Sequence, residues 1–112
     1  MQKQKLTARE QTARTILEIC DFLLVQGILA RRINVLPIPL PTGGYRPSTM
    51  RGMPDVMGIM PATGRSICIE VKTGRDKLRP EQVAFLNAAR QLGAKVIVAT
   101  DINDFKRKFY GI

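Results

Sequence analysis

Three residues in the middle of the chain have the chemistry needed to hydrolyse a phosphodiester bond. Asp55 follows Pro54, and further along the chain Glu70 and Lys72 stand on either side of Val71. Carboxylates are hard oxygen ligands suited to Mg²⁺, which lowers the pKa of a water and neutralises charge that develops on a phosphate. A lysine beside them can hold or activate the attacking water. The pattern therefore predicts a metal-dependent phosphodiesterase site at Asp55, Glu70 and Lys72.

The segment that carries two of these charges has the pattern of a buried strand. Side chains alternate faces along a strand, so in residues 65–72 Glu70 and Lys72 share one face with Ser66 and Cys68. The opposite face consists of Ile67, Ile69 and Val71. Because it is wholly apolar, we expect a helix to cover it. Two charges on such a strand are costly unless they are paired or hold a metal; a simple ion pair between Glu70 and Lys72 is the alternative interpretation.

The composition is that of a small basic protein. We expect a single domain over residues 1–112. Its 18 Lys and Arg against 9 Asp and Glu give a net charge of +9, which favours a polyanionic partner. No apolar run approaches the ~20 residues that span a bilayer, and no signal peptide is evident, so we expect a cytoplasmic protein with no membrane partner. Cys20 and Cys68 lie in apolar patterns typical of free thiols, and the absence of histidine excludes the usual zinc site.

The first expected helix covers residues 7–26 and carries an acid that is a candidate for the site. Thr7 is its predicted N-cap, Glu10 follows at the spacing of a capping box, and Gly27 ends the helix. The apolar stripe consists of Ala13, Ile16, Leu17, Cys20, Leu23 and Leu24. Glu10 continues this stripe along positions 10, 13, 17, 20 and 24, so we expect its carboxylate at the edge of the core rather than in solvent.

The remaining elements complete an αβββαβ order followed by a terminal helix. We expect strands at 28–38, 55–60, 65–72 and 94–100, and helices at 80–92 and 101–108. Val83, Leu86, Ala89 and Arg90 are expected on alternate turns of the helix at 80–92. Phe105 and Phe109 are expected to face inward from the terminal helix. Residues 39–53 are rich in proline and glycine, which predicts an irregular loop of functional importance.

Together these residues resemble the PD-(D/E)xK nuclease superfamily, and most closely its VRR-NUC branch. The resemblance rests on Pro54-Asp55, on Glu70-Val71-Lys72, on Gln82 with Phe85 in the following helix, and on Glu10 in the first helix. It covers nearly the whole chain and implies a restriction-endonuclease-like α/β core, in which helices flank a central mixed sheet. A chain this short resembles the phage- and prophage-encoded members, which implies the cytoplasm of a bacterial host cell.

The resemblance also implies roles for these residues. The expected ligands of Mg²⁺, or of Mn²⁺ in its place, are Asp55, Glu70, the backbone carbonyl of Val71 and Glu10. Lys72 acts on the attacking water, and Gln82 positions the phosphate or Lys72. Taken singly, Asp55 also fits a turn, Glu10 a capping box and Gln82 a helix surface, so the prediction depends on their combination.

Basic residues flank the predicted site in sequence. Those expected to contact nucleic acid are Arg46, Arg51, Arg75, Lys77 and Arg79. Contacts of this kind bind backbone phosphates with little sequence readout, and no recognition helix or zinc finger is present. We therefore expect DNA to be recognised by structure, and the resemblance implies branched forms such as Holliday junctions or flaps.

One site in a domain this small cuts two strands only if two copies act together, so a homodimer is expected. Candidate interface residues lie on the first helix and at Phe105, Phe109 and Tyr110. Two alternatives to a DNA endonuclease remain: a non-catalytic basic DNA-binding module on the same fold, and an enzyme that cleaves RNA. The sequence contains no feature that reads a 2′-hydroxyl and would separate RNA from DNA.

Overall fold

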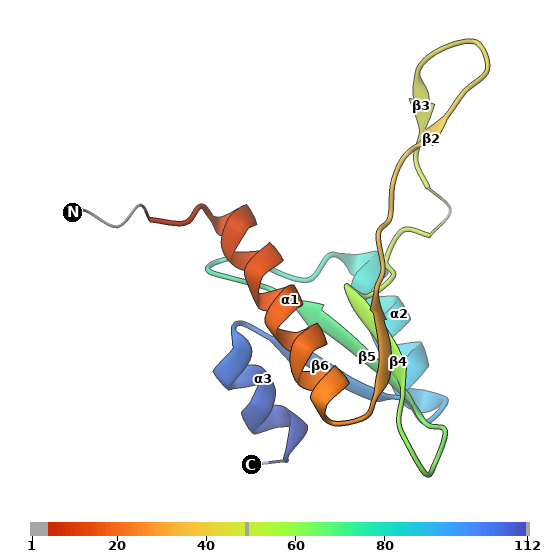
Figure 1. Cartoon of the computed structure of the whole chain (residues 1–112). Helices are drawn as coiled ribbons and strands as arrows, with labels where there is room; N and C mark the ends of the chain where they lie inside the picture. The colour runs from red at the N-terminus through yellow and green to blue at the C-terminus, as the bar shows by residue number, and fades with distance from the viewer. Residues whose placement is uncertain (1–4, 49, 112) are drawn as a thin grey trace.

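The protein is built on a four-stranded mixed sheet, shown in Figure 1 as a computed structural model that describes residues 5–48 and 50–111. In spatial order the strands are β1 (Leu29–Arg32), β4 (Val56–Ile59), β5 (Ser66–Val71) and β6 (Lys95–Ala99). β4 is antiparallel to both β1 and β5, whereas β6 is parallel to β5. The expected mixed sheet flanked by helices is confirmed. None of the described helices is long and apolar enough to cross a membrane.

Three helices cover the two faces of the sheet. They are α1 (Ala8–Val25), α2 (Pro80–Gln91) and α3 (Ile102–Phe109). On the side of α1 and α3, the core contains Ile67, Ile69 and Val71 of β5 together with Ile19 and the fully buried Phe105. On the other side Cys68 packs with residues of α2. The predicted alternation of β5 is therefore confirmed, and β5 is the buried centre of the molecule.

The buried face of α1 differs from the expected stripe. Its buried residues are Thr15, Ile16, Ile19 and Leu23, whereas Leu17 and Leu24 are 61% and 74% exposed. The helix is turned this way because its inner face packs on the sheet and on α3, and because the Thr12 hydroxyl lies 2.8 Å from that of Thr73 beyond β5. Glu10 lies on the same side of the helix as Leu17 and Leu24, so it is exposed. Its expected place at the edge of the core is wrong.

α2 and α3 begin and end close to the expected residues. The inner face of α2 is formed by Gln82 and Leu86, with Phe85 and Ala89 partly buried, while Val83 is 39% exposed. The expectation for Val83 is therefore wrong: the face is set by packing against β6 and β5 rather than by apolar spacing alone. In α3, Asp101 is the N-cap and accepts a hydrogen bond from Asp104 N, and the inward position of Phe105 is confirmed.

A hairpin replaces part of the expected irregular loop. The strand expected over 28–38 stops at Arg32, and β2 (Ile38–Pro39) then pairs with β3 (Tyr45–Arg46) in a separate two-stranded sheet. Prolines interrupt this segment, and a residue without an N–H cannot continue a sheet ladder. Figure 1 shows that the hairpin stands well away from the four-stranded sheet. The core therefore ends at β1, and residues 36–48 form a projecting element that we call the arm.

Candidate metal centre

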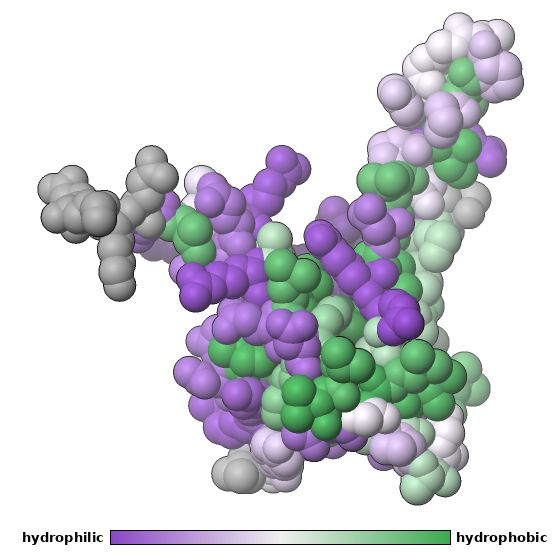
Figure 2. Space-filling view, viewed as in Figure 1, coloured by the Kyte–Doolittle hydropathy of each residue, from purple (hydrophilic) through white to green (hydrophobic). Residues whose placement is uncertain are grey.

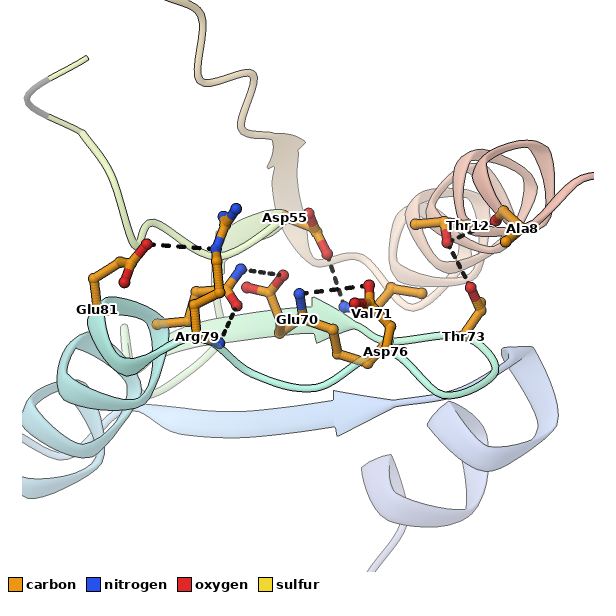
Figure 3. Close-up of polar contacts among 11 residues, drawn as sticks. Ala8, Thr12, Asp55, Glu70, Val71, Thr73, Asp76, Arg79 and Glu81 are labelled. Carbon is orange, nitrogen blue, oxygen red and sulfur yellow. Dashed lines mark hydrogen bonds and ion pairs between the residues drawn. The ribbon is translucent and has the colours of Figure 1, made fainter. Parts of the chain in front are cut away.

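Asp55 and Glu70 come together because β4 and β5 are antiparallel neighbours. Val56 pairs with Ile69, so Asp55 at the start of β4 lies opposite Glu70. The backbone N–H of Val71 donates a 2.7 Å hydrogen bond to Asp55 Oδ2, which holds this carboxylate at the end of β5 (Figure 3). The backbone carbonyl of Asp55 also accepts from Ile33 N at 2.7 Å. The two acids singled out from the sequence therefore share one site.

Glu70 is the most unusual residue of this site. Its side chain is only 2% exposed. Oε1 accepts a 3.3 Å hydrogen bond from Gln82 Nε2, whereas Oε2 is buried and has no hydrogen-bond partner within the described part of the chain. Burial is the largest cause that raises the pKa of Glu70 to about 8; the neighbouring Asp55 carboxyl acts in the same direction, and Lys72 and Arg79 oppose the shift. A buried carboxylate with a free oxygen facing another acid calls for a proton or a cation.

The donor set fits a hard divalent cation. Mg²⁺ is commonly held by only one or two carboxylates and keeps several of its waters, and Asp55 and Glu70 supply two such groups at one end of the sheet. The unpartnered Glu70 Oε2 is the atom whose burial a cation would offset. Within residues 5–48 and 50–111, no third acid, cysteine or histidine joins the pair. The ligand role of the Val71 carbonyl stays a prediction.

Lys72 is the next residue that the site positions. Its side chain is 14% exposed and lies on the same face of the strand as Glu70, and its ammonium group is 3.8 Å from Asp76 Oδ2. Its backbone N–H donates to Ala99 of β6 at 2.9 Å, which ties the end of the motif to the parallel strand. Lys72 therefore lies next to the carboxylate pair, with the exposed Asp76 as its ion-pair partner.

Gln82 is buried rather than exposed. It is 4% exposed and makes two hydrogen bonds, one as acceptor and one as donor. Its Oε1 accepts from Arg79 N at 2.9 Å and so caps α2, while its Nε2 donates to Glu70. One amide thus couples the start of α2 to the buried carboxylate, and its placement at the site agrees with the prediction that Gln82 belongs to it.

Glu10 is not brought to the carboxylate pair. It lies in the first turn of α1, where the Thr7 hydroxyl donates to its Oε1 at 2.9 Å and its own N–H donates to Thr7 at 3.1 Å. The absence of any three-residue cluster of possible ligands among the described residues separates it from Asp55 and Glu70. The capping interpretation of Glu10 accounts for these contacts, and α1 instead approaches the site through Thr12 and Thr73 (Figure 3).

The predicted basic residues fall into separate groups. Arg51 and Arg79 both pair with Glu81, at 3.5 and 3.4 Å, and line a cavity of about 320 Å³ together with Asp55 and Gln82. Arg75 lines a second cavity of about 560 Å³ with Arg9, Thr12 and Thr73. Lys77 is exposed, and Arg46 lies on β3 in the arm. Two of the five therefore adjoin the carboxylate pair directly.

Two residues around the site had not been singled out from the sequence. Asn34 lines the same cavity as Asp55, and Glu81 pairs with both Arg51 and Arg79. Gly52 has a φ of +90°, and a Cβ there would lie 2.6 Å from the backbone oxygen of Glu81. The available signal was Gly52 three residues before Asp55, because glycine suits such a conformation and such a close approach.

Comparison with known proteins adds a family to this geometry. The family model described as VRR-NUC domain matches residues 45–101, just over half of the chain. The matched segment contains Asp55, Glu70, Lys72 and Gln82, and it excludes α1 and β1. No curated protein and no solved structure matches the chain.

Proposed function

The chain belongs to the VRR-NUC family of the PD-(D/E)xK nuclease superfamily, and we propose that it is an endonuclease that hydrolyses DNA phosphodiester bonds with Mg²⁺, or with Mn²⁺ in its place. The observation that carries this proposal is the buried Glu70, whose Oε2 has no partner among the described residues and whose pKa the neighbouring Asp55 carboxyl helps to raise. A purely structural ion pair would leave no orphan oxygen. A family that generally uses divalent ions supports the same conclusion.

Asp55, Glu70 and the Val71 carbonyl are the groups proposed to hold the cation. When bound, a divalent cation neutralises a phosphate oxygen and makes a water easier to deprotonate. Lys72 is proposed to hold or activate the attacking water, because its side chain is only 14% exposed and its charge acts on Glu70. Its ion pair with the exposed Asp76 is loose enough, at 3.8 Å, to be exchanged for a phosphate oxygen.

The start of α2 is proposed to receive the phosphate. Arg79 and Arg51 line the cavity that contains Asp55, and the N-terminus of a helix favours an anion. Gln82 holds this end of α2 against Glu70 through its two hydrogen bonds. The phosphate and the cation would thereby meet at a fixed separation, which is what proximity contributes to the rate.

Selectivity for branched DNA and a homodimer are the finer parts of the proposal. The basic side chains near the site are suited to phosphates rather than to base edges. Two exposed apolar groups can supply a dimer contact: Leu17, Leu24 and Val25 on α1, at 61%, 74% and 83% exposure, and Tyr110 after α3, at 57%. Phe105 is fully buried, so its expected part in an interface is wrong.

The test is cleavage of labelled duplex, single-stranded, flap and four-way-junction DNA, and of a matched RNA duplex, in Mg²⁺ and in EDTA. We expect the wild-type protein to cut DNA only with the metal, with branched forms preferred. Lys72→Met should lower the rate at least about 100-fold, whereas Lys106→Met, an exposed lysine on α3, should not. Tight DNA binding without cutting in Mg²⁺ would support the non-catalytic DNA-binding module. Cutting of the RNA duplex at the same rate as DNA would support the RNA-cleaving alternative.

A further inference from the structure

The arm, residues 36–48, projects away from the four-stranded sheet (Figure 1). β2 and β3 pair only with each other, through Ile38 with Arg46 and Pro39 with Tyr45. At its tip Gly43 N donates to Leu40 O at 3.1 Å, the bond of a turn with proline in its preferred second position. Four prolines in thirteen residues restrict its backbone. An isolated two-stranded hairpin is only marginally stable in water, so a partner is expected to hold it.

The arm exposes large apolar and aromatic side chains, Leu36 at its base and Leu40 and Tyr45 near the tip. Leu36, Leu40 and Tyr45 are 63%, 39% and 72% exposed, and Figure 2 shows hydrophobic surface at intervals along the projection. A rigid element with such side chains at its end can enter between bases. Apolar wedges that separate base steps are a recurrent device in DNA-bending proteins, and an aromatic ring can stack on an unpaired base.

Charge favours nucleic acid over protein as the partner. No Asp or Glu occurs between Asp21 and Asp55, whereas this stretch contains Arg31, Arg32, Arg46 and Arg51. The base of the arm also adjoins the proposed site, because Arg51 and the residues around it line the cavity that contains Asp55. A polyanion bound at the site therefore lies beside a chain segment whose charged residues are all basic and that leads to the arm.

We propose that the arm is a wedge for branched DNA: Tyr45 and Leu40 enter the branch point, where bases are already unstacked, while Arg46 binds an adjoining phosphate. This inference rests on the proposed function and deepens it, since it names the element that selects branched substrates. Branch points favour such an element because the cost of unstacking is lowest at unpaired bases. The arm would then set where the strand enters the cavity beside Asp55.

The test uses binding in EDTA, so it does not depend on cleavage. A four-way junction and a linear duplex carry 2-aminopurine at the branch and at the matching paired position. The proteins compared are the wild type, the arm variant Leu40→Ser/Tyr45→Ala, and Leu92→Ser, an equally apolar control at 90% exposure on the C-cap of α2. Sedimentation of each protein alone at the same concentration reports on self-association.

We expect the wild type and Leu92→Ser to raise the fluorescence of the junction probe and the arm variant not to do so. The arm variant should bind the junction about tenfold more weakly and the linear duplex unchanged. Equal fluorescence and equal junction affinity for all three proteins would overturn the proposal. A wild-type dimer that the arm variant fails to form would also overturn it, since the arm would then contact a second copy. If the wild-type protein never cuts DNA, the proposed nuclease activity is refuted. The binding test of the arm in EDTA still applies in that case.

Discussion

Glu70→Gln is expected to stabilise the metal-free protein at neutral and alkaline pH. Burial raises the pKa of Glu70 from 4.5 to about 8, so the folded state keeps a proton that the unfolded state releases. Stability from this group is fully present below pH 4.5 and is lost as the pH rises toward 8. With about 1.4 kcal/mol for each pH unit, the free energy of unfolding should fall by about 3 kcal/mol between pH 4.5 and pH 7.

The amide removes this loss because it is neutral at every pH, so no buried charge forms beside Asp55. The variant should therefore match the wild type near pH 4.5 and exceed it by about 3 kcal/mol at pH 7. Urea unfolding of both proteins in EDTA at several pH values measures the difference. Mg²⁺ at pH 8 should then stabilise the wild type and not the variant, because binding to the folded state alone raises stability.

Glu18→Gln is the matched control, because Glu18 forms only a 3.9 Å pair with Arg14 on the surface of α1. Its effect should be below about 1 kcal/mol and should vary little across this range of pH. The reasoning is refuted if Glu70→Gln is less stable than the wild type at pH 8, or if the two proteins differ by the same amount at every pH. Either result would mean that burial does not raise the pKa of Glu70.

Three further changes test the framework around the site. Gln82→Ala should destabilise the protein by about 1–2 kcal/mol, since it removes the cap of α2 and a buried hydrogen bond. It should also slow cleavage. An unchanged free energy of unfolding in urea would contradict the structural role of Gln82. Gly52→Ala places a Cβ 2.6 Å from Glu81 O at a φ of +90°, whereas Gly64→Ala, at φ +71°, meets nothing within 4 Å. Gly64→Ala should cost about 1–2 kcal/mol of backbone strain, and Gly52→Ala clearly more. Equal melting temperatures for these two variants would count against the close approach of Gly52 to Glu81. Phe105→Ala empties the centre of the α1–α3 face and should cost about 3–5 kcal/mol by calorimetry; a loss under 1 kcal/mol would show that the ring is not part of the core.

The carboxylate pair could be predicted from the sequence because its geometry is local. Strand alternation places Glu70 and Lys72 on one face of β5 whatever surrounds them, and a tight turn between two strands makes them antiparallel neighbours. Asp55 and Glu70 then face each other as a consequence of register. The same reasoning correctly anticipated β6, α2 and α3.

The orientation of α1 could not be predicted in the same way. Two adjacent stripes of the helix are apolar, and tertiary contacts decide which is buried. Thr15 and Ile19 turn inward while Leu17 and Leu24 stay exposed, because Thr12 bonds to Thr73 and the helix packs against α3. With this face of α1 buried, Glu10 lies on the exposed side of the helix rather than at the edge of the core.

The arm shows a second limit of sequence reasoning. A proline- and glycine-rich stretch predicts an irregular loop, yet the same residues that prevent a long strand also build a tight turn. Gly43 and Gly44 both have positive φ and close the hairpin. Local pattern therefore identified a break in regular structure, but neither the end of β1 at Arg32 nor the hairpin that follows.

The most direct test of the carboxylate site is the single-turnover cleavage rate of Glu70→Gln beside that of Glu18→Gln, in saturating Mg²⁺ on the preferred DNA. The first variant is expected to fold at least as stably as the wild type, so a lost rate cannot be attributed to unfolding. We predict a loss of at least about 1000-fold for Glu70→Gln, since it removes a proposed ligand of the proposed catalytic metal, and a wild-type rate for Glu18→Gln. Equal rates for the two variants would contradict the assignment of Asp55 and Glu70 as the metal centre.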